Sequence, residues 1–411
     1  MGAMDALDVG VVGCGSAGAA AALFLARAGH KVTVYERVED PGPVGAGITL
    51  QPTGQLVLAR LGLLAPIVDH GARLDRLHCV TRGGRTLVDL RYATIDPTMF
   101  GVGLHRGALF QTLYDAVRHE PGVTVRLGAA VTGVGRDGER PVVHGERGPL
   151  GVHDLLIAAD GSVSELHATG GVPVRAREYA WGALWFVADD PGPAFRGELF
   201  QVVHGARRMF GILPTGRGPG RATTVVSLYW SLKVADHARW RDAGLAAWKA
   251  DVLALDRRVG PVLDQITDPG QVLLARYRDV RMRRWHGERV VFLGDSAHAM
   301  SPQLGQGANL ALWDAMSLAD ALTAARDLPS ALAAYSRARR AHLGFYQLMT
   351  RALTPLFQSS STVLGWARDL VMPIANWLPP THRLMVRTMA GVQLGFLRRP
   401  LALPAPPEVP R

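Results

Sequence analysis

The sequence has too few cysteines for a disulfide framework. Its only two, Cys14 and Cys79, belong to no Cys-x-x-Cys or Cys/His spacing that would indicate a metal site. Two cysteines cannot hold together a chain of 411 residues, which is long enough to bury a large hydrophobic core instead. We therefore predict a protein of a reducing compartment that contains no structural metal.

Lysine is almost absent, although the formal net charge is +10. Only Lys31, Lys233 and Lys249 stand among the 45 basic residues, and the arginines are scattered along the chain. Nucleic-acid binding proteins usually show a basic patch with interleaved aromatic residues, or a recognisable binding motif. Neither is present, so the sequence predicts no nucleic-acid partner.

A long apolar run of the membrane-spanning kind is also absent. Residues 9–26 carry no charge, but glycine and serine cluster within them, which fits a strand, a turn and a helix better than a membrane span. No basic segment with a small-residue cleavage site accompanies them, so we expect no signal peptide. The expected location is the cytoplasm, with a peripheral position at the inner membrane left open.

A glycine-rich turn lies within this uncharged segment, with the pattern Gly13-x-Gly15-x-x-Gly18. Residues 9–12 and 31–35 predict two strands, and the Ala-rich stretch between them predicts a helix. In such a βαβ unit the first glycine permits the turn, the second lets the backbone approach a pyrophosphate, and the third lets the helix pack closely on the strand. We predict a dinucleotide site here, with Ala17 among its contacts.

A carboxylate follows the second predicted strand. Glu36 can accept hydrogen bonds from ribose hydroxyls there, which argues against a 2′-phosphate on the nucleotide. FAD and NAD remain as alternatives on this evidence. We interpret Cys14, inside the glycine-rich turn, as a small filler residue, because no basic neighbour would activate its thiol.

Three motifs stand in one characteristic order along the chain. They are the glycine-rich turn with Glu36-Arg37, the stretch "LLIAADGSVS" around Asp160, and the stretch "GDSAHAMSPQLGQGAN" from Gly294 to Asn309. With these motifs, residues 8 to 340 resemble the single-component FAD-dependent aromatic hydroxylases, the family of 4-hydroxybenzoate and salicylate hydroxylases. The resemblance is strongest to the ubiquinone-pathway branch of that family.

The resemblance implies both a fold and a reaction. The fold is α/β, with an FAD-binding Rossmann-like domain of the 4-hydroxybenzoate hydroxylase type, an inserted β-sheet substrate domain and C-terminal helices. FAD is the implied cofactor, and NADPH or NADH its transient reductant. After O₂ addition, a flavin C4a-hydroperoxide would hydroxylate or epoxidise an electron-rich aromatic, enol, polyprenyl or polyketide-like molecule. The cofactor supplies this chemistry, so we name no catalytic acid or base.

The resemblance also implies individual cofactor contacts. Asp295 would accept a hydrogen bond from a ribityl hydroxyl, while Gly305 and Gly307 would let the backbone lie against the isoalloxazine. The helix starting near Ala308 would direct its N–H groups at the flavin, where negative charge develops on reduction. Asn309 would bond the flavin edge or cap that helix. The other predicted contacts are Arg37, Arg106, Asp160 and Pro302.

Some positions depart from the family pattern. His167 stands where the family usually has an arginine, and Trp313, which we ascribe to helix packing, where it commonly has an acidic or amide residue. We expect His298 to satisfy local backbone groups, because the family's chemistry requires no base there. No second Gly-x-Gly-x-x-Gly follows a strand, so the reductant should bind transiently in the flavin cleft.

Residues 175–271 change to alternating strands separated by Gly/Pro turns. We predict that they cover the flavin and that Trp185, Phe186, Met209, Tyr229 and Pro302 line an aromatic substrate pocket, with ordinary sheet packing as the alternative. The predicted parts are an FAD-binding part (5–76, 101–174 and 276–345), a substrate-binding sheet (77–100 and 175–275), a helical segment (346–400) and a flexible tail (401–411).

Two other flavin functions were weighed against the monooxygenase. A flavin-dependent halogenase would need a lysine near the end of the first sheet segment and a Trp-x-Trp-x-Ile-Pro element, and the sequence has neither. A non-catalytic flavin-binding or redox-sensing protein would bind FAD without turning over a ring substrate. The expected partners are O₂ and a hydrophobic or aromatic small molecule.

The last 71 residues, 341–411, combine seven arginines with many aromatic residues and only two acids. Such a helical segment could lie in a membrane interface through Trp366, Trp377 and nearby arginines. Alternatively, these side chains pack on the flavin domain or form a homodimer interface. We favour this second interpretation, because Asp369 and Pro373 interrupt the apolar stripe.

Overall fold

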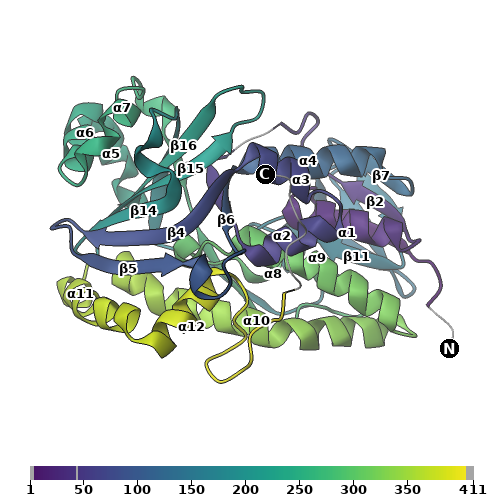
Figure 1. Cartoon of the computed structure of the whole chain (residues 1–411). Coiled ribbons are helices and arrows are strands. Elements are labelled where there is room, and N and C mark those ends of the chain that lie inside the picture. The colour runs from purple at the N-terminus through teal and green to yellow at the C-terminus, as the bar shows by residue number, and fades with distance from the viewer. Residues whose placement is uncertain (1–3, 43–44, 404–411) are drawn as a thin grey trace.

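Two large β-sheets and two smaller ones, with helices that run between and beneath the large sheets, form the structure (Figure 1). A computed structural model of the chain describes residues 4–42 and 45–403. The predicted flexible tail, 401–411, lies outside the described residues from position 404 onward.

The first sheet is parallel and has the strand order β19-β11-β1-β2-β7. Its central strands are short and almost wholly apolar, as is usual for a parallel sheet that is buried on both faces. The strands are β1 (Asp8–Val12), β2 (Lys31–Tyr35), β7 (Val123–Arg126), β11 (Leu155–Ala158) and β19 (Val290–Phe292). This sheet confirms the predicted Rossmann-like fold and both strands of the βαβ unit.

Three helices cover this sheet or lie beside it. Helix α1 (Ser16–Arg27) contacts both α4 (Arg106–His119) and α9 (Gly307–Ala324). In α1 the residues from Ala17 to Leu23 are all buried, which small side chains permit because they let the helix lie close to its neighbours. The first turns of α1 and α9 therefore lie at the same edge of the sheet.

The second sheet is mixed and larger. Its path is β17-β13-β16-β15-β14-β4-β6-β3, with β5 paired to β4. The strands are β3 (Gly47–Leu50), β4 (Ala72–Thr81), β5 (Thr86–Arg91), β6 (Gly101–His105), β13 (Trp181–Asp189), β14 (Gly197–His204), β15 (Arg208–Arg217), β16 (Thr224–Lys233) and β17 (Leu273–Ala275). The predicted alternation in β16 is present, since Val226, Leu228 and Trp230 share one buried core.

That core lies between the sheet and three short helices that the sequence analysis missed. They are α5 (His237–Ala243), α6 (Leu245–Leu253) and α7 (Gly260–Leu263). Each is too short to show several turns of helical periodicity, so an alternating-strand pattern dominated the segment. Their buried Trp248 and Val252 pack with Phe186 of β13. The Phe186 side chain therefore packs on the opposite face of the sheet from Trp185, because successive strand residues point to opposite faces, although Phe186 also borders the cavity that Trp185 lines.

Smaller elements complete this part of the fold. They are an antiparallel sheet of β8 (Val131–Asp137), β9 (Arg140–Gly145) and β10 (Gly148–Val152), the pair β12 (Val174–Glu178) and β18 (Arg278–Met282), and helices α2 (Pro52–Arg60), α3 (Leu64–His70) and α8 (Asp295–His298). The predicted boundary between residues 76 and 77 falls inside β4, because a strand pattern does not mark where the chain passes from one part to the next. The other predicted boundaries stay predictions.

The C-terminal helices α10 (Leu328–Phe357), α11 (Thr362–Trp377) and α12 (Pro379–Met389) run beneath both sheets (Figure 1). Helix α11 passes through Pro373 without a break. Trp366 and Trp377 are each 79% exposed, so the interpretation that this segment's aromatic side chains pack on the protein is wrong for these two, whereas it is confirmed for the buried Phe345, Tyr346 and Phe357. No helix in the described part of the chain is both long and apolar enough to cross a bilayer.

Candidate functional site

Three loops that are distant in sequence meet where strands of the parallel sheet end. A Cβ added at Gly13, after β1, would lie 2.6 Å from the carbonyl oxygen of Ala159, after β11. A Cβ at Gly294, after β19, would lie 3.0 Å from the Cβ of Ala17 in α1. The edge of an open α/β sheet where strand carboxyl ends meet is the usual place for a ligand.

The glycines of the first loop serve two different purposes. Gly13 has a φ of 93°, and a Cβ on Gly18 would lie 1.9 Å from the carbonyl oxygen of Gly13, so the fold itself requires both. Gly15 has an ordinary φ of −72°, and a Cβ there would meet nothing within 4 Å. Its missing side chain therefore matters for what approaches from outside, at the uncapped N-terminus of α1.

Glu36 is fixed beside this loop. Its Oε2 accepts a hydrogen bond of 2.9 Å from the backbone N–H of Cys14, and its Oε1 accepts one of 3.0 Å from Val38. Burial, with the charge of Glu36 in addition, raises the pKa of the Cys14 thiol to about 12. The thiol therefore stays protonated, which agrees with a filler role for Cys14.

Asp295 follows the third strand and points into open space. It is exposed, whereas its neighbours Ser296 and His298 are buried. A Cβ at Gly307, the first residue of α9, would lie 3.9 Å from Asp295 Oδ1. The carboxylate thus lies beside the start of α9, close to the turn in which Gly305 has a φ of 61°.

Asn309 holds this turn in place. Its side chain accepts a hydrogen bond of 2.8 Å from Gln51 N and donates bonds of 3.0 and 3.1 Å to Thr49 and Gly305 carbonyls. The helix begins at Gly307 after Gln306 without a side-chain cap, so the alternative that Asn309 caps it is wrong. Contact of the Asn309 and Ala308 backbone with a flavin edge stays a prediction.

Asp160 contributes a buried carboxylate oxygen. Its Oδ1 has no hydrogen-bond partner among the described residues. Burial raises the pKa of Asp160, against a hydrogen bond from Ser164 that lowers it. His167, on the same loop, forms a hydrogen bond of 2.7 Å between its Nε2 and the carbonyl oxygen of Ser296. An unpaired buried oxygen is costly, and a donor on a ligand would satisfy it.

Two predicted arginines lie at the surface of this region. Arg106 begins α4 and is exposed, and a Cβ at Gly45 would lie 3.2 Å from its Cδ. Arg37 is exposed just beyond Glu36. Both are available to an anionic ligand, and their contact with one stays a prediction.

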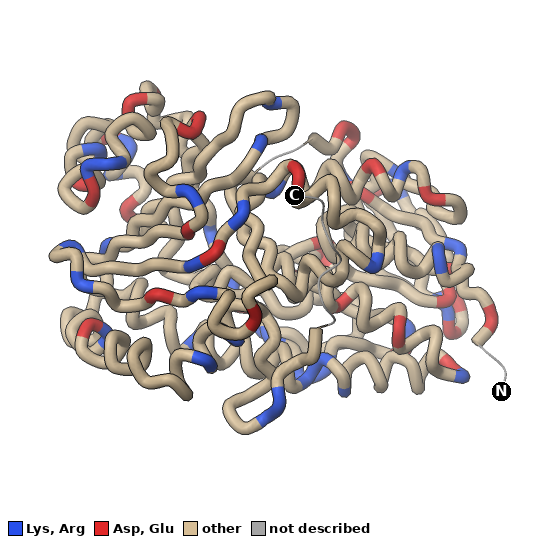
Figure 2. The backbone as a smooth tube through the Cα atoms, in the orientation of Figure 1, with Lys and Arg blue, Asp and Glu red and all other residues tan. Residues whose placement is uncertain are grey.

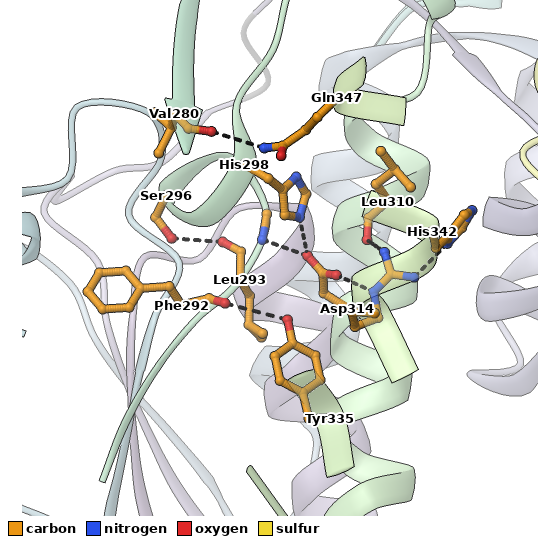
Figure 3. A network of polar contacts seen from close by, with 12 residues as sticks. Val280, Phe292, Leu293, Ser296, His298, Leu310, Asp314, Tyr335, His342 and Gln347 are labelled. Carbon is orange, nitrogen blue, oxygen red and sulfur yellow. Dashed lines mark hydrogen bonds and ion pairs between the residues drawn. The ribbon is translucent and has the colours of Figure 1, made fainter. Parts of the chain in front are cut away.

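A buried ionic network beneath α8 escaped the sequence analysis (Figure 3). Asp314 of α9 accepts hydrogen bonds from Gly294 N at 2.9 Å and from Arg339 Nε at 2.6 Å. His298 Nε2 lies 2.5 Å from the same carboxylate, so the expectation that His298 satisfies backbone groups is wrong. An ion pair across two helices and a turn leaves no local sequence pattern, which is why the prediction missed it.

The network continues to the C-terminal part. Arg339 NH1 lies 2.6 Å from His342 Nδ1, and His342 Nε2 lies 2.7 Å from the carbonyl oxygen of Gly391. Trp313 packs edge-on against His342 with ring centroids 6.0 Å apart, in keeping with the predicted packing role. The turn that bears Asp295 is thus connected to α9, α10 and the residues after α12.

An aromatic cluster lies on the other face of the second sheet. Trp185 and Tyr229 are cross-strand neighbours with ring centroids 5.0 Å apart. The indole N–H of Trp185 donates to the hydroxyl oxygen of Tyr277 at 3.1 Å, and Gln201 Nε2 donates to the hydroxyl of Tyr229. Burial raises the pKa of Tyr277 to about 12, so this phenol remains neutral.

A cavity of about 300 Å³ lies beside this cluster, and Trp185 is the member of the cluster that lines it. Trp185 and Leu273 line one side, and Gly45, Ala46 and His105, next to Arg106, line another. Met209 is 7% exposed and packs in a core with residues of the C-terminal helices. For Met209 the structure therefore favours the alternative of ordinary packing over a place in the substrate pocket. Pro302 is exposed at a turn before α9, and its place in a substrate pocket stays a prediction.

In the described ranges, 4–42 and 45–403, no three His, Cys, Asp or Glu side chains are grouped so that they could hold a metal ion. The polar groups at the strand ends are instead arranged for a large organic ligand, with open approach at Gly15 and an unpaired oxygen on Asp160.

Comparisons with known proteins agree with this arrangement. Residues 6–345 match the family described as FAD binding domain. A kynurenine 3-monooxygenase of Salinispora arenicola is 31% identical over 365 residues, which cover 81% of this chain and 76% of the relative. An aurachin C monooxygenase/isomerase of Stigmatella aurantiaca is 27% identical over 94% of this chain and 98% of its own length.

Solved structures share the fold. Klebsiella pneumoniae HpxO complexed with FAD and uric acid superposes with a TM-score of 0.78 at 22% identity, over 95% of this chain and 98% of that one. The tetrameric form of 2-methyl-3-hydroxypyridine-5-carboxylic acid oxygenase gives 0.74 at 20% identity, over 93% and 96%.

Proposed function

Because this chain belongs to the FAD binding domain family and is an FAD-dependent monooxygenase, we propose that it hydroxylates a planar, hydrophobic ring that bears an oxygen substituent. The cavity between the aromatic cluster and the start of α4 carries this proposal, since it can take one flat molecule beside the cofactor site. Relatives named for kynurenine, 6-methylpretetramide and 3-hydroxybenzoate support an aromatic or polyketide-like substrate.

The residues at the strand ends fit FAD. Gly15 leaves room for a pyrophosphate at the N-terminus of α1, and Glu36 lies beside it to accept ribose hydroxyls. Asp160 and Asp295 offer carboxylate oxygens to the ribityl chain, and the Gly305–Gly307 turn offers bare backbone to the ring system. When bound and reduced by NAD(P)H, FAD supplies the oxygen activation and transfer for which these side chains provide no substitute.

The chain's own residues bind and orient the substrate. Trp185 lines the cavity and provides a flat apolar surface against which a ring can stack, and Tyr229 packs against Trp185 with ring centroids 5.0 Å apart. Tyr277 accepts the Trp185 N–H, which leaves its own hydroxyl hydrogen to donate to a substrate oxygen. The surrounding sheet keeps water from the ring, which protects a reactive cofactor from wasteful decay.

The reductant would enter the same cleft. A second Gly-x-Gly-x-x-Gly spacing, from Gly133 to Gly138, lies within strand β8 and the turn after it and opens no helix, so among the described residues it offers no second βαβ unit to hold NADH or NADPH. Arg106 and Arg37 are exposed beside Gly45 and Glu36, respectively, and could attract its phosphates. NADH or NADPH should therefore bind in the cleft only transiently and form no stable complex with the protein.

Substrate recognition gives the direct test of this function. Purified protein should oxidise NADPH or NADH faster when a suitable phenol is added, and product mass should rise by one oxygen atom. Trp185→Ala should raise KM by about 5- to 150-fold, the range expected for losing a buried aromatic contact of about 1–3 kcal/mol. Tyr277→Phe should raise KM for the oxygen-bearing ring more than for its deoxy analogue.

Leu127→Ser, at an exposed position outside the cluster, is the control and should leave KM unchanged. If no ring compound stimulates cofactor oxidation and no oxygenated product forms, the protein is a flavin-binding or redox-sensing protein, and the proposed function fails. If Tyr277→Phe changes KM equally for the oxygen-bearing ring and for its deoxy analogue, the Tyr277 hydroxyl takes no part in substrate recognition.

Cofactor retention tests the two carboxylates independently of turnover. Glu36→Gln and Asp295→Asn should each weaken FAD binding by about 1 kcal/mol, since each would replace a charge-assisted hydrogen bond from a ligand hydroxyl by a weaker neutral one. Flavin fluorescence on dilution measures this affinity. Glu139→Gln, an 85% exposed carboxylate in a surface ion pair, is the matched control. If FAD affinity is unchanged in both site variants, FAD does not contact Glu36 or Asp295 in the way proposed.

A further inference from the structure

Helix α11 presents an uncharged apolar face to solvent. Its exposed side chains are Val363 (73%), Trp366 (79%), Leu370 (67%), Val371 (59%), Ile374 (53%) and Trp377 (79%). They recur at three- and four-residue spacing, so they form one stripe along the helix. Scattered exposed apolar residues are ordinary, but a contiguous stripe with a tryptophan near each end marks a binding surface.

The two charged residues of α11 point away from this face. Arg368 is 1% exposed and donates to the carbonyl oxygens of Gly205 and Leu356, both at 3.1 Å. It also pairs with Asp369 at 2.6 Å, while its guanidinium lies 5.2 Å from the centroid of Phe357. The residues that interrupt the apolar pattern in sequence therefore anchor the helix to the protein and leave the outer stripe without charge.

Arginines border the stripe. Arg85 donates to the carbonyl oxygen of Asp369 at 2.5 Å, and Arg207 donates to that of Ser360 at 3.2 Å, so both lie beside α11 and both are exposed. Arg383, also exposed, lies at the other end. Between positions 341 and 403 Asp369 is the only acidic residue, and it is paired; Asp89 of β5, which contacts Asn376 of α11, is paired with Arg76 and Arg91. The border is therefore positively charged.

A surface cavity of about 540 Å³ adjoins Trp377. Arg383, His382, Asn376 and Thr86 line it together with Trp377. The Nδ1 atom of His382 is buried without a hydrogen-bond partner in the part of the chain that the structure describes. A cation, an amide and a hydroxyl around one hollow suit a phosphate group that lies at the edge of the apolar stripe.

A second feature lies on the same side. The loop after α12 exposes Leu397 completely and Phe396 by 58%, and Arg398 and Arg399 follow directly. Figures 1 and 2 show this loop, with its basic residues, along the lower edge of the molecule together with α11 and α12. Apolar tips followed by arginines again suit a boundary between hydrocarbon and anionic headgroups.

We propose that this face, which we call the α11 surface, docks on an anionic phospholipid bilayer. The helix lies in the interface with its apolar stripe among the acyl chains and its arginines at the phosphates. A second copy of the chain is the poorer occupant, because a twofold contact would bring the same arginines of both copies together. This docking is independent of the monooxygenase chemistry.

Flotation of the whole protein with vesicles tests the proposal. We expect co-flotation with phosphatidylcholine vesicles that contain phosphatidylglycerol, weakened by salt and by omission of the anionic lipid. Trp366→Ser with Trp377→Ser should reduce binding at least about tenfold, and Arg383→Gln about fivefold, the effect of one cation near an anionic surface. Leu127→Ser with Val163→Ser, exposed apolar residues elsewhere, should leave binding unchanged.

The contrary outcomes are distinct. Recovery of the protein in the soluble fraction with both kinds of vesicle overturns the proposal, as does vesicle binding that the two tryptophan substitutions leave intact. Light scattering covers the alternative occupant: a concentration-dependent dimer that these substitutions abolish, without vesicle binding, would assign the α11 surface to a second copy. FAD content and turnover in solution are measured separately and should not change.

Discussion

Replacing Asp314 by asparagine should lower the free energy of unfolding by about 3–5 kcal/mol, the usual cost of removing one partner from a buried ion pair. Asp314 is wholly buried and accepts from Arg339 at 2.6 Å and from Gly294 N at 2.9 Å. The amide keeps the shape of the side chain but removes its charge, which leaves the guanidinium, 1% exposed, without an anion. Urea unfolding of the cofactor-free protein measures the effect.

Asp320→Asn on the same helix is the matched control. Asp320 pairs with Arg60 at 2.7 Å, but the two side chains are 52% and 44% exposed, so its loss should cost at most about 1 kcal/mol. Adding Arg339→Met to Asp314→Asn should restore part of the lost stability, because no buried charge then remains unpaired. Equal costs for Asp314→Asn and Asp320→Asn would show that the buried pair contributes no more than a surface one.

The same network makes stability depend on pH in a defined direction. Burial alone would raise the pKa of Asp314, but the charges of His298 and Arg339 outweigh it and hold this pKa at about 2. A lowered carboxylate pKa gives stability that is present above pH 4 and lost as the pH falls toward 2. Asp314→Asn should therefore abolish the part of the acid unfolding that lies in this range.

His342 acts over a higher range. Burial, with the charge of Arg339 in addition, lowers its pKa from 6.5 to about 3. The folded state therefore keeps His342 as a neutral imidazole. The contribution of His342 to the free energy of unfolding is complete above pH 6.5 and declines as the pH falls toward 3. The variant at Asp314 should retain this upper, shallower part of the pH dependence.

The sequence predicted those parts of the molecule in which local pattern and local geometry coincide. The βαβ unit is an example, because the apolar runs, the glycine spacing and Glu36 all lie within one short segment. Gly13 and Gly18 are required by contacts between near neighbours, so their positions could be inferred without the rest of the fold.

Other features depend on contacts that no short segment contains. Asn309 is fixed by Thr49 of β3 and by Gln51 at the start of α2, which are far away in sequence, so its structural role could not be predicted. Phe186 and Trp185 were assigned to one pocket because both are aromatic, although neighbouring strand positions point to opposite faces. The exposure of Trp366 was missed because Arg368 and Asp369 turn inward, which depends on Gly205 and Leu356.

Substituting alanine at two glycines of the first loop should separate binding from folding. Gly18→Ala places a Cβ 1.9 Å from the carbonyl oxygen of Gly13, so α1 must move away from β1. Overpacking of this kind costs about 1–3 kcal/mol, and the displaced helix N-terminus no longer faces the phosphates. We expect a lower melting temperature without cofactor and an FAD affinity reduced by about tenfold or more.

Gly15→Ala should leave the cofactor-free protein unchanged, because φ at this position is −72° and the new methyl group meets no atom within 4 Å. The methyl group would instead occupy the space through which the pyrophosphate approaches, so FAD affinity should fall by about 5- to 100-fold. Differential scanning fluorimetry with and without added FAD measures both quantities on one sample.

Gly138→Ala would not serve as the control, since φ there is 58° and alanine would be strained. Gly344→Ala, in a helix with open space around it, is suitable. If Gly15→Ala retains full FAD affinity, the pyrophosphate does not pass over this residue, and the loop serves only to join β1 to α1.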